Sequence, residues 1–289
     1  MPKIKYKSIN FRSSSFELLE YAVDIVDEYE AQGYNLTLRQ LYYQLVARGY
    51  IENNERSYKR IGTLINDARL AGYIDWLSIT DRTRSMNKNA HWNNPKEIID
   101  AAINQYAINT RANQPNYIEV WVEKEALVDV VAKACRPLDV AYFACRGYVS
   151  QSEMWVAARR FTTEKNNYII HLGDHDPSGV DMTRDIVDRM EMFGTDIEVK
   201  RIALNYNQIE QYSPPPNPTK LTDSRCKSYI ASYGHKSWEL DALNPTIITN
   251  MISEQVYALT DFDLWNKMKT RQMNERREMQ RYSEKLKDI

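Results

Sequence analysis

The fold is decided by two stretches of the sequence, YIEVWVEKEALVDVVAKAC at residues 117–135 and NYIIHLGDHDPSG at residues 167–179. Each begins with a short run of aliphatic, β-branched and aromatic residues, which is typical of a buried strand. The first run ends at an acidic residue, and the second is followed closely by two. A helical pattern comes next in both cases, so the chain predicts parallel strands joined by helices.

The same alternation continues around these two stretches. Strand-like composition is found at 138–145 and 196–204, and helical periodicity at 150–164 and 177–194. We therefore expect a βαβαβαβ unit across residues 113–205. Its strands should form an open, Rossmann-like parallel sheet that helices cover on both faces.

Three helices are predicted before this unit. Apolar residues recur at helical spacing from residue 15 to about residue 30, from Leu38 to about residue 48, and from residue 57 to residue 71. Thr37 is well placed to cap the second helix. A basic third helix followed by an extended stretch is typical of a winged helix-turn-helix, which we place at about residues 35–88 within an N-terminal region of residues 1–112.

The charge of the chain is unevenly distributed. The net charge is −1, but residues 38–88 carry nine Lys or Arg against five acids. Such a local excess of positive charge indicates either a phosphate-facing surface or an ordinary solvated helix face. The candidates for DNA contact are Lys59, Arg60, Arg69, Arg82 and Arg84.

The C-terminal part is expected to be less regular. Residues 206–289 begin with a segment that has four prolines within positions 214–218, which should exclude regular structure there. The remainder has helical composition, so we expect a Pro-rich linker followed by a helical extension. The fold class predicted for the whole chain is therefore α/β, with helical additions at both ends.

Several function classes are disfavoured by composition. Three scattered cysteines provide neither a disulfide framework nor a zinc motif. No apolar run approaches the ~20 residues of a membrane span, and the first residues lack a secretory signal. We therefore expect a cytoplasmic location, at the nucleoid in a cell or in the host cytoplasm for a virus. Glycine-rich phosphate loops are absent from the sequence, so the chain alone should not hydrolyse ATP.

Acidic residues lie where the parallel strands should end. Glu123 directly follows one strand, and Asp174 and Asp176 follow another. If the two strands are neighbours, these carboxylates meet at one edge, where their mutual repulsion favours a divalent cation such as Mg²⁺. In the alternative interpretation, Glu123 caps the following helix and the two aspartates shape a tight turn.

These acids lie in motifs that resemble a known family. The sequence from Glu123 to Ala126 is similar to the E-K-x-A motif of Toprim domains, and that from Asp174 to Gly179 to their D-x-D-P-x-G motif. In their residues, the two motifs resemble those of the topoisomerase VI A subunit and of the related transesterase that makes meiotic double-strand breaks. Upstream, the segment from Arg39 to Tyr43 resembles the winged-helix motif of this family, an Arg followed by a Tyr pair.

The resemblance implies Mg²⁺-dependent cleavage of double-stranded DNA. Tyr43 would attack a phosphodiester and form a 5′-phosphotyrosyl link, with Arg39 favouring its phenolate and Glu123, Asp174 and Asp176 holding the metal. It also implies a homodimer and a separate ATPase partner subunit. The residues themselves leave two alternatives open. One is a hydrolytic Toprim nuclease, in which Tyr43 is a helix aromatic without a chemical role, and the other is a DNA-binding protein without turnover.

Overall fold

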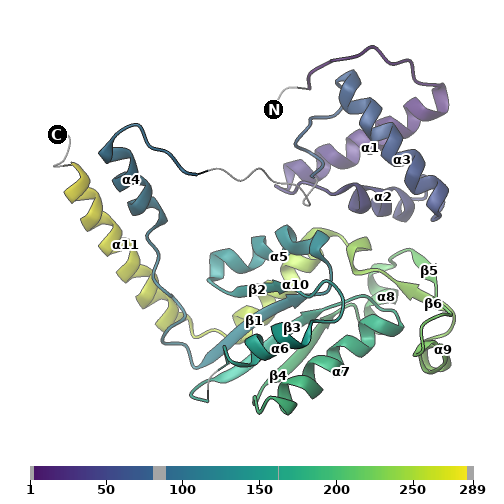
Figure 1. The fold of residues 1–289 in the computed structure, drawn as a ribbon. Coiled ribbons are helices and arrows are strands. Elements are labelled where there is room, and N and C mark those ends of the chain that lie inside the picture. Colours follow the sequence, from purple (N-terminus) through teal and green to yellow (C-terminus); the bar gives the residue numbers. More distant parts are fainter. Residues whose placement is uncertain (1–2, 81–88, 162, 285–289) are drawn as a thin grey trace.

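The computed structural model describes residues 3–80, 89–161 and 163–284, and these form a mixed α/β fold (Figure 1). Its centre is a four-stranded sheet in the order β2-β1-β3-β4, in which every neighbouring pair is parallel. The predicted parallel sheet is thus confirmed. The strands are β1 (Asn116–Val122), β2 (Ala141–Ala144), β3 (Asn166–Leu172) and β4 (Glu198–Ala203).

Helices cover both faces of this sheet, as the alternation of strands and helices predicts. Because successive side chains of a strand point to opposite faces, Val120 and Trp121 of β1 belong to different apolar clusters. The cluster of Val120 includes α5 (Val128–Cys135) and α10 (Pro245–Ala258). The cluster of Trp121 includes α6 (Gln151–Ala158) and α7 (Pro177–Met192).

The segment expected to be a C-terminal extension therefore contributes to the core. Helix α10 buries Ile248, Ile252 and Val256 in the same cluster as α5 and the sheet. Sequence periodicity indicates that such a helix has an apolar face, but it does not indicate which surface the face covers.

A three-helix unit precedes the sheet. It consists of α1 (Ser13–Ala31), α2 (Leu38–Ala47) and α3 (Glu55–Ala71), which share an apolar cluster of their own. The predicted cap of α2 is confirmed. The Thr37 hydroxyl accepts from the N–H of Gln40, and the side-chain oxygen of Gln40 accepts from the N–H of Thr37. Arg82 and Arg84 of the expected wing lie outside the described residues, so the wing stays a prediction.

Two helices lie side by side away from the sheet (Figure 1). Helix α4 (Pro95–Gln105) belongs to the region predicted as N-terminal, yet it packs against α11 (Phe262–Glu284) near the other end of the chain. Ser283 donates to Asp100 at 2.6 Å, joining the two helices. This pairing of segments distant in the sequence was not predicted.

The proline-rich segment contains a strand, so the expectation that it has no regular structure is wrong. Strand β5 (Pro216–Pro218) pairs antiparallel with β6 (Lys236–Trp238). Proline lacks an N–H but keeps its carbonyl acceptor, and it is tolerated in a short two-stranded ladder where an edge needs no donor. In the chain, helix α8 (Tyr206–Tyr212) precedes this ladder and helix α9 (Cys226–Tyr233) lies between its two strands.

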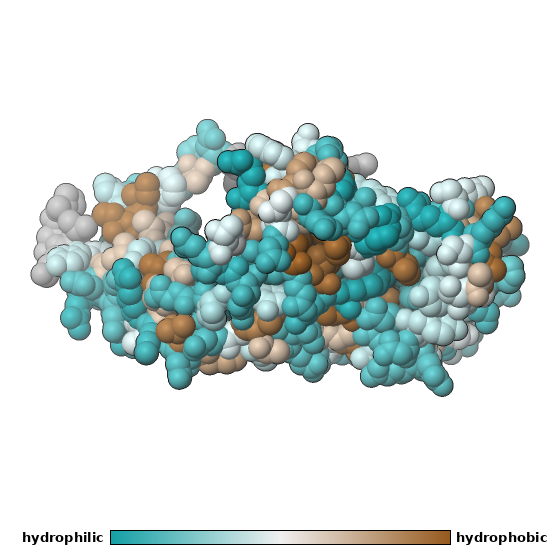
Figure 2. Space-filling view, turned by 90° about the horizontal axis from the view of Figure 1, so that it is seen from below, coloured by the Kyte–Doolittle hydropathy of each residue, from teal (hydrophilic) through white to brown (hydrophobic). Residues whose placement is uncertain are grey.

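The surface of the molecule is largely polar on the face that Figure 2 shows. Hydrophobic residues form separate patches there, between broader hydrophilic areas. Over residues 3–80, 89–161 and 163–284, no helix has the length and apolarity that a membrane crossing requires.

His171 is the most deeply buried ionisable group of the sheet. It lies on β3 with an exposed fraction of 0%, and its Nδ1 is 2.9 Å from the hydroxyl of Thr183 on α7. Burial, together with the positive charge of Arg201, lowers the pKa of His171 to about 3. The folded protein therefore keeps this imidazole neutral at pH values where the unfolded chain protonates it.

We expect the free energy of unfolding to fall as the pH is lowered from about 6.5 towards 3. In this window the unfolded state binds the extra proton, so stability rises with pH, by about 1.4 kcal/mol per pH unit at most for this one group. Urea unfolding of the wild type and of His171→Asn measures the slope. Equal slopes for both would contradict the prediction, and His91→Asn, at an exposed histidine, is the control.

Candidate functional site

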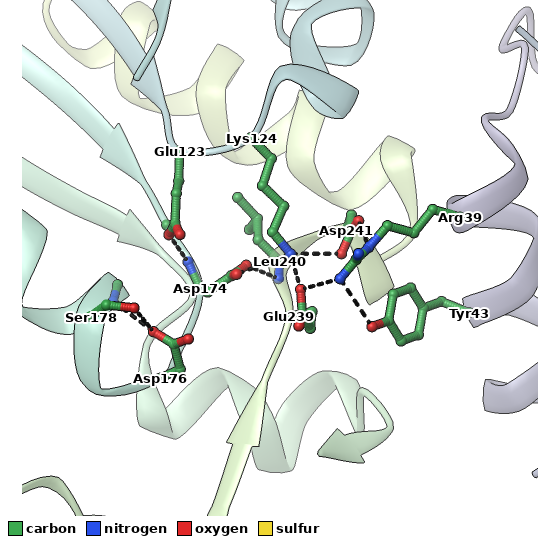
Figure 3. Close-up of polar contacts among 12 residues, drawn as sticks. Arg39, Tyr43, Glu123, Lys124, Asp174, Asp176, Ser178, Glu239, Leu240 and Asp241 are labelled. Carbon is green, nitrogen blue, oxygen red and sulfur yellow. Dashed lines mark hydrogen bonds and ion pairs between the residues drawn. The ribbon is translucent and has the colours of Figure 1, made fainter. Parts of the chain in front are cut away.

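Glu123 and Asp174 meet at the carboxyl ends of β1 and β3, as predicted (Figure 3). The two strands are parallel neighbours that end level, with Val122 paired to Leu172. The N–H of Glu123 donates to the carbonyl of Leu172 at 2.8 Å, and the Glu123 Oε2 accepts from the N–H of Asp174 at 2.8 Å. The glutamate therefore binds the aspartate turn and does not cap the helix that follows it.

Asp174 has both carboxylate oxygens engaged. Its Oδ1 accepts from the N–H of Leu240 at 2.7 Å, and its Oδ2 lies 2.9 Å from the ammonium of Lys124. The residue is 5% exposed. A buried carboxylate needs such partners, because an unpaired charge away from water is strongly unfavourable.

Asp176 is the N-cap of α7. Its Oδ1 accepts from the N–H of Gly179 at 2.6 Å and from the hydroxyl of Ser178 at 2.9 Å. This is the turn-shaping role considered as the alternative for the aspartates, and it is confirmed for Asp176. The N-terminus of a helix also favours negative charge, so the carboxylate is held at this position by two effects.

Two glycines leave room for the Glu123 carboxylate. A Cβ added at Gly173 would lie 3.1 Å from the Glu123 Oε2. One added at Gly179 would lie 3.0 Å from the same oxygen and 2.3 Å from the carbonyl oxygen of Asp174. Gly179 therefore needs to be glycine because of the Asp174 carbonyl, whereas a Cβ at Gly173 would require neighbouring side chains to shift by a few tenths of an ångström.

Arg201 of β4 brings positive charge to the main chain of this turn. Its guanidinium donates to the carbonyls of Asp174 at 2.6 Å, Gly179 at 2.8 Å and Gly173 at 3.1 Å. Burial lowers the pKa of Arg201, and the charge of Glu123 opposes this shift. The sequence carried one signal for the residue, an arginine among the apolar positions of a predicted strand.

The acidic edge has the donor chemistry that Mg²⁺ prefers, namely carboxylate oxygens. Burial raises the pKa of Glu123, the N–H of Asp174 lowers it, and the charge of Asp176 raises it. Within the part of the chain that the structure describes, however, no three or more His, Cys, Asp or Glu side chains are arranged to hold one metal ion. The two aspartate carboxylates are engaged with other partners: Asp174 binds Lys124 and Leu240, and Asp176 binds the start of α7.

Lys124 and Arg39 connect this edge to the three-helix unit. The Lys124 ammonium contacts Asp174, Asp241 at 3.1 Å and Glu239. The Arg39 guanidinium contacts Glu239 at 2.7 Å and Asp241 at 2.9 Å. We call these five side chains the charge cluster (Figure 3). Burial alone would lower the pKa of Lys124, but its three carboxylate partners raise it above its ordinary value, so the ammonium stays charged.

Tyr43 lies at the end of this cluster. Its hydroxyl is 3.4 Å from the Arg39 guanidinium, and the residue is 5% exposed. Burial raises the pKa of the Tyr43 phenol, Glu239 raises it further, and Arg39 acts in the opposite direction. The charge of Arg39 thus favours the phenolate, as expected, but burial raises the pKa of the phenol by more than Arg39 lowers it.

The predicted DNA-contacting residues of α3 differ in exposure. Lys59 and Arg60 are exposed; Lys59 pairs with Glu55 at 2.7 Å, and Arg60 is 3.4 Å from the carbonyl of Ser14. Arg69 is only partly exposed, since it donates to main-chain carbonyls of the segment after α3, including that of Trp76 at 3.2 Å. The guanidinium of Arg69 is therefore engaged with the main chain in the described conformation.

An aromatic cluster holds His175, which stands between the two aspartates. The His175 main chain exchanges two hydrogen bonds with Trp238 of β6, at 2.8 and 2.9 Å, and its Nδ1 is 2.7 Å from the hydroxyl of Tyr229. The surrounding rings belong to Tyr206, Tyr229, Tyr233 and Trp238. The high tyrosine content of the chain was the signal in the sequence, although it did not indicate this position.

Comparison of the chain with protein-family models, with curated proteins and with solved structures gave no match. The function is therefore inferred from the chemistry of the site. That chemistry consists of three acids at one sheet edge and a charge cluster that reaches from Asp174 to Tyr43.

Gly179→Ala should destabilise the protein by about 1–3 kcal/mol, because its Cβ would overlap the carbonyl of Asp174. Gly62→Ala is the matched control. Gly62 lies inside α3, and its added Cβ would make an ordinary contact of 3.4 Å with the Leu38 side chain of α2, so a gain in stability of roughly 0.5–1 kcal/mol is expected. Urea denaturation measures both. A Gly179→Ala protein as stable as the wild type would show that the turn does not need the close approach.

Proposed function

We propose that the chain is a Toprim-type protein, similar to the topoisomerase VI A subunit, that cleaves double-stranded DNA with the help of a divalent cation. The observation that carries the proposal is the continuous set of contacts from Tyr43, through Arg39, Glu239 and Lys124, to Asp174 beside Glu123. A candidate nucleophile and a candidate metal site thus face each other across one interface.

Each residue has a part in this reaction. Glu123, Asp174 and Asp176 would hold Mg²⁺, which when bound neutralises charge on the phosphate. The Tyr43 oxygen attacks phosphorus, the bond to the 3′ oxygen breaks, and the DNA 5′ end becomes joined to tyrosine. The phenol gives its proton to water and the leaving 3′ oxygen takes one up. Arg39 orients the Tyr43 hydroxyl and lowers the cost of its ionisation.

The three-helix unit is proposed to be a winged-helix domain that binds the duplex. The exposed Lys59 and Arg60 of α3 support a phosphate-facing role. In the family that the sequence resembles, the tyrosine of one protomer meets the metal of its partner, so the proposal includes a homodimer. A separate ATPase subunit would supply the energy for strand passage. Both partners belong to the proposal through the resemblance in sequence.

One observation favours a second candidate, hydrolytic cleavage. Tyr43 is buried and its phenol has a raised pKa, which disfavours it as a nucleophile in the conformation described. In a hydrolytic nuclease the water activated at the acidic edge attacks the phosphate, and Tyr43 packs without a chemical role.

Cleavage of supercoiled plasmid with Mg²⁺ separates these candidates. The wild type should nick or cut the DNA and leave protein covalently attached to 5′ ends. The attached protein is detected after denaturation, and proteinase treatment then releases the cut DNA. Tyr43→Phe should lose both, because the attacking oxygen is removed, and Glu123→Gln should lose cleavage. Tyr42→Phe, at the neighbouring tyrosine that binds Asn53, is the matched control and should still form the attached product.

Two results would change the assignment. Cutting by Tyr43→Phe at the wild-type rate with free ends would identify hydrolysis. DNA left intact by the wild type with Mg²⁺ and with Mn²⁺ would contradict cleavage by this chain alone and leave either a required partner subunit or DNA binding without turnover.

DNA binding by α3 is tested through its salt dependence. Each phosphate contact contributes about 0.9 to the slope of log K against log salt, so Lys59→Ala and Arg60→Ala should each reduce the slope by about that amount. Arg69→Ala should lower stability and leave the slope nearly unchanged, since its guanidinium binds main-chain carbonyls. A slope that falls for Arg69→Ala alone would contradict this surface.

A further inference from the structure

Lys124 directly follows Glu123 and turns back towards the acidic edge. Its ammonium contacts Asp174 at 2.9 Å, Asp241 at 3.1 Å and Glu239, and its side chain is 17% exposed. Asp241 is fully buried, with an exposed fraction of 0%. A cation thus already occupies the Asp174 carboxylate in the described conformation, and it belongs to the chain itself.

A second cation at the Asp174 carboxylate would compete with the partners that are already there. Its Oδ1 is bound to the N–H of Leu240, whose position follows from the backbone of residues 240–242. Its Oδ2 is bound to Lys124, whose flexible four-carbon stem allows the ammonium to move. Of these two partners, the lysine is therefore the one that can be exchanged.

The charges of the cluster show where the ammonium would go. The cluster sets three carboxyl groups, those of Asp174, Glu239 and Asp241, against the two cations Arg39 and Lys124. When another cation neutralises Asp174, the remaining two carboxylates balance Arg39 and Lys124. Lys124 already contacts both, so it can leave Asp174 and stay paired.

We propose that Lys124 is a built-in counter-cation of Asp174, which a divalent cation displaces onto Glu239 and Asp241 when it binds at the acidic edge. This rests on the metal-binding part of the proposed function, and not on whether cleavage uses Tyr43 or water. The direction of Asp174 explains why the described side chains do not surround a metal ion. Lys124 occupies the Oδ2 oxygen of the carboxylate until the exchange occurs.

The exchange would change the contact between Arg39 and the Tyr43 hydroxyl. Arg39 shares Glu239 and Asp241 with Lys124 and also contacts the Tyr43 hydroxyl. Once Lys124 no longer shares its charge with Asp174, it attracts these two carboxylates more strongly, which weakens their hold on Arg39. Metal binding on the sheet and the position of the candidate nucleophile on α2 are thereby linked through one pair of acids, so Glu239 and Asp241 are positioning residues.

Nuclear magnetic resonance of lysine ammonium groups observes the exchange directly. The full chain, labelled with ¹⁵N-lysine, is titrated with Mg²⁺, and Lys124→Arg identifies the resonance. The Lys124 signal should shift and saturate with the metal. The signal of Lys133 should not move, because its ammonium is held by the neutral carbonyls of Gln32 and Gly33, which makes it the matched control.

Calorimetric binding of Mn²⁺ gives an independent readout. Lys124→Met keeps the stem and removes the competing charge, so Mn²⁺ should bind about tenfold more tightly or better, the size of effect that one adjacent charge has on a carboxylate. Lys200→Met is the charge-matched control on β4, where the ammonium pairs with Glu198 at 3.4 Å, and its affinity should equal that of the wild type. If Lys124→Met does not fold, the resonance of the wild type decides.

The possible outcomes separate this inference from the proposed function. Mg²⁺ binding and DNA cleavage with an unmoved Lys124 resonance, or unchanged Mn²⁺ affinity in folded Lys124→Met, would overturn the displacement and leave the proposed function standing. If neither the wild type nor Lys124→Met binds either ion at millimolar concentration, the metal site and the displacement both fail. Binding by Lys124→Met alone would support the displacement in its strongest form.

Discussion

The hydrogen bond from the N–H of Asp174 to the Glu123 carboxylate is the contact on which the site depends. It forms because β1 and β3 are adjacent and parallel and end at the same level, so that a side chain from one strand end reaches the main chain of the other. Gly173 and Gly179 leave space for it, and Arg201 supplies positive charge to the same turn. A side chain in place of either glycine would move the glutamate or the turn.

The charge cluster adds a second constraint, between the two parts of the fold. Arg39 comes from the three-helix unit and Lys124 from the sheet, and they share the acids Glu239 and Asp241 that precede α10. Ion pairs of this kind contribute little net stability, because removing charges from water cancels much of their attraction. Their contribution is geometrical: partners left unpaired would be costly, so the unit that carries Tyr43 has a preferred position relative to the acids.

The aromatic cluster around His175 has a similar role on the other side of the turn. The two hydrogen bonds between His175 and Trp238 tie the turn to β6, and the rings of α8 and α9 pack around the imidazole. Asp174 and Asp176 flank this residue, so their main chain follows its position. The region that composition alone described as a linker is therefore one of the supports of the acidic edge.

The sequence by itself determined the parallel sheet, the capped start of α2 and the position of acids at strand ends. These follow from local patterns, since strand and helix periodicity and capping act within a few residues. Tertiary structure alone decided that β1 lies beside β3, that Asp174 faces Lys124, and that Tyr43 is buried. The partners concerned are far apart in the chain, with a sequence separation of 115 for Lys124 and Glu239 and of 200 for Arg39 and Glu239. A pattern of neighbouring residues carries no record of such contacts, because they arise only when distant segments pack together.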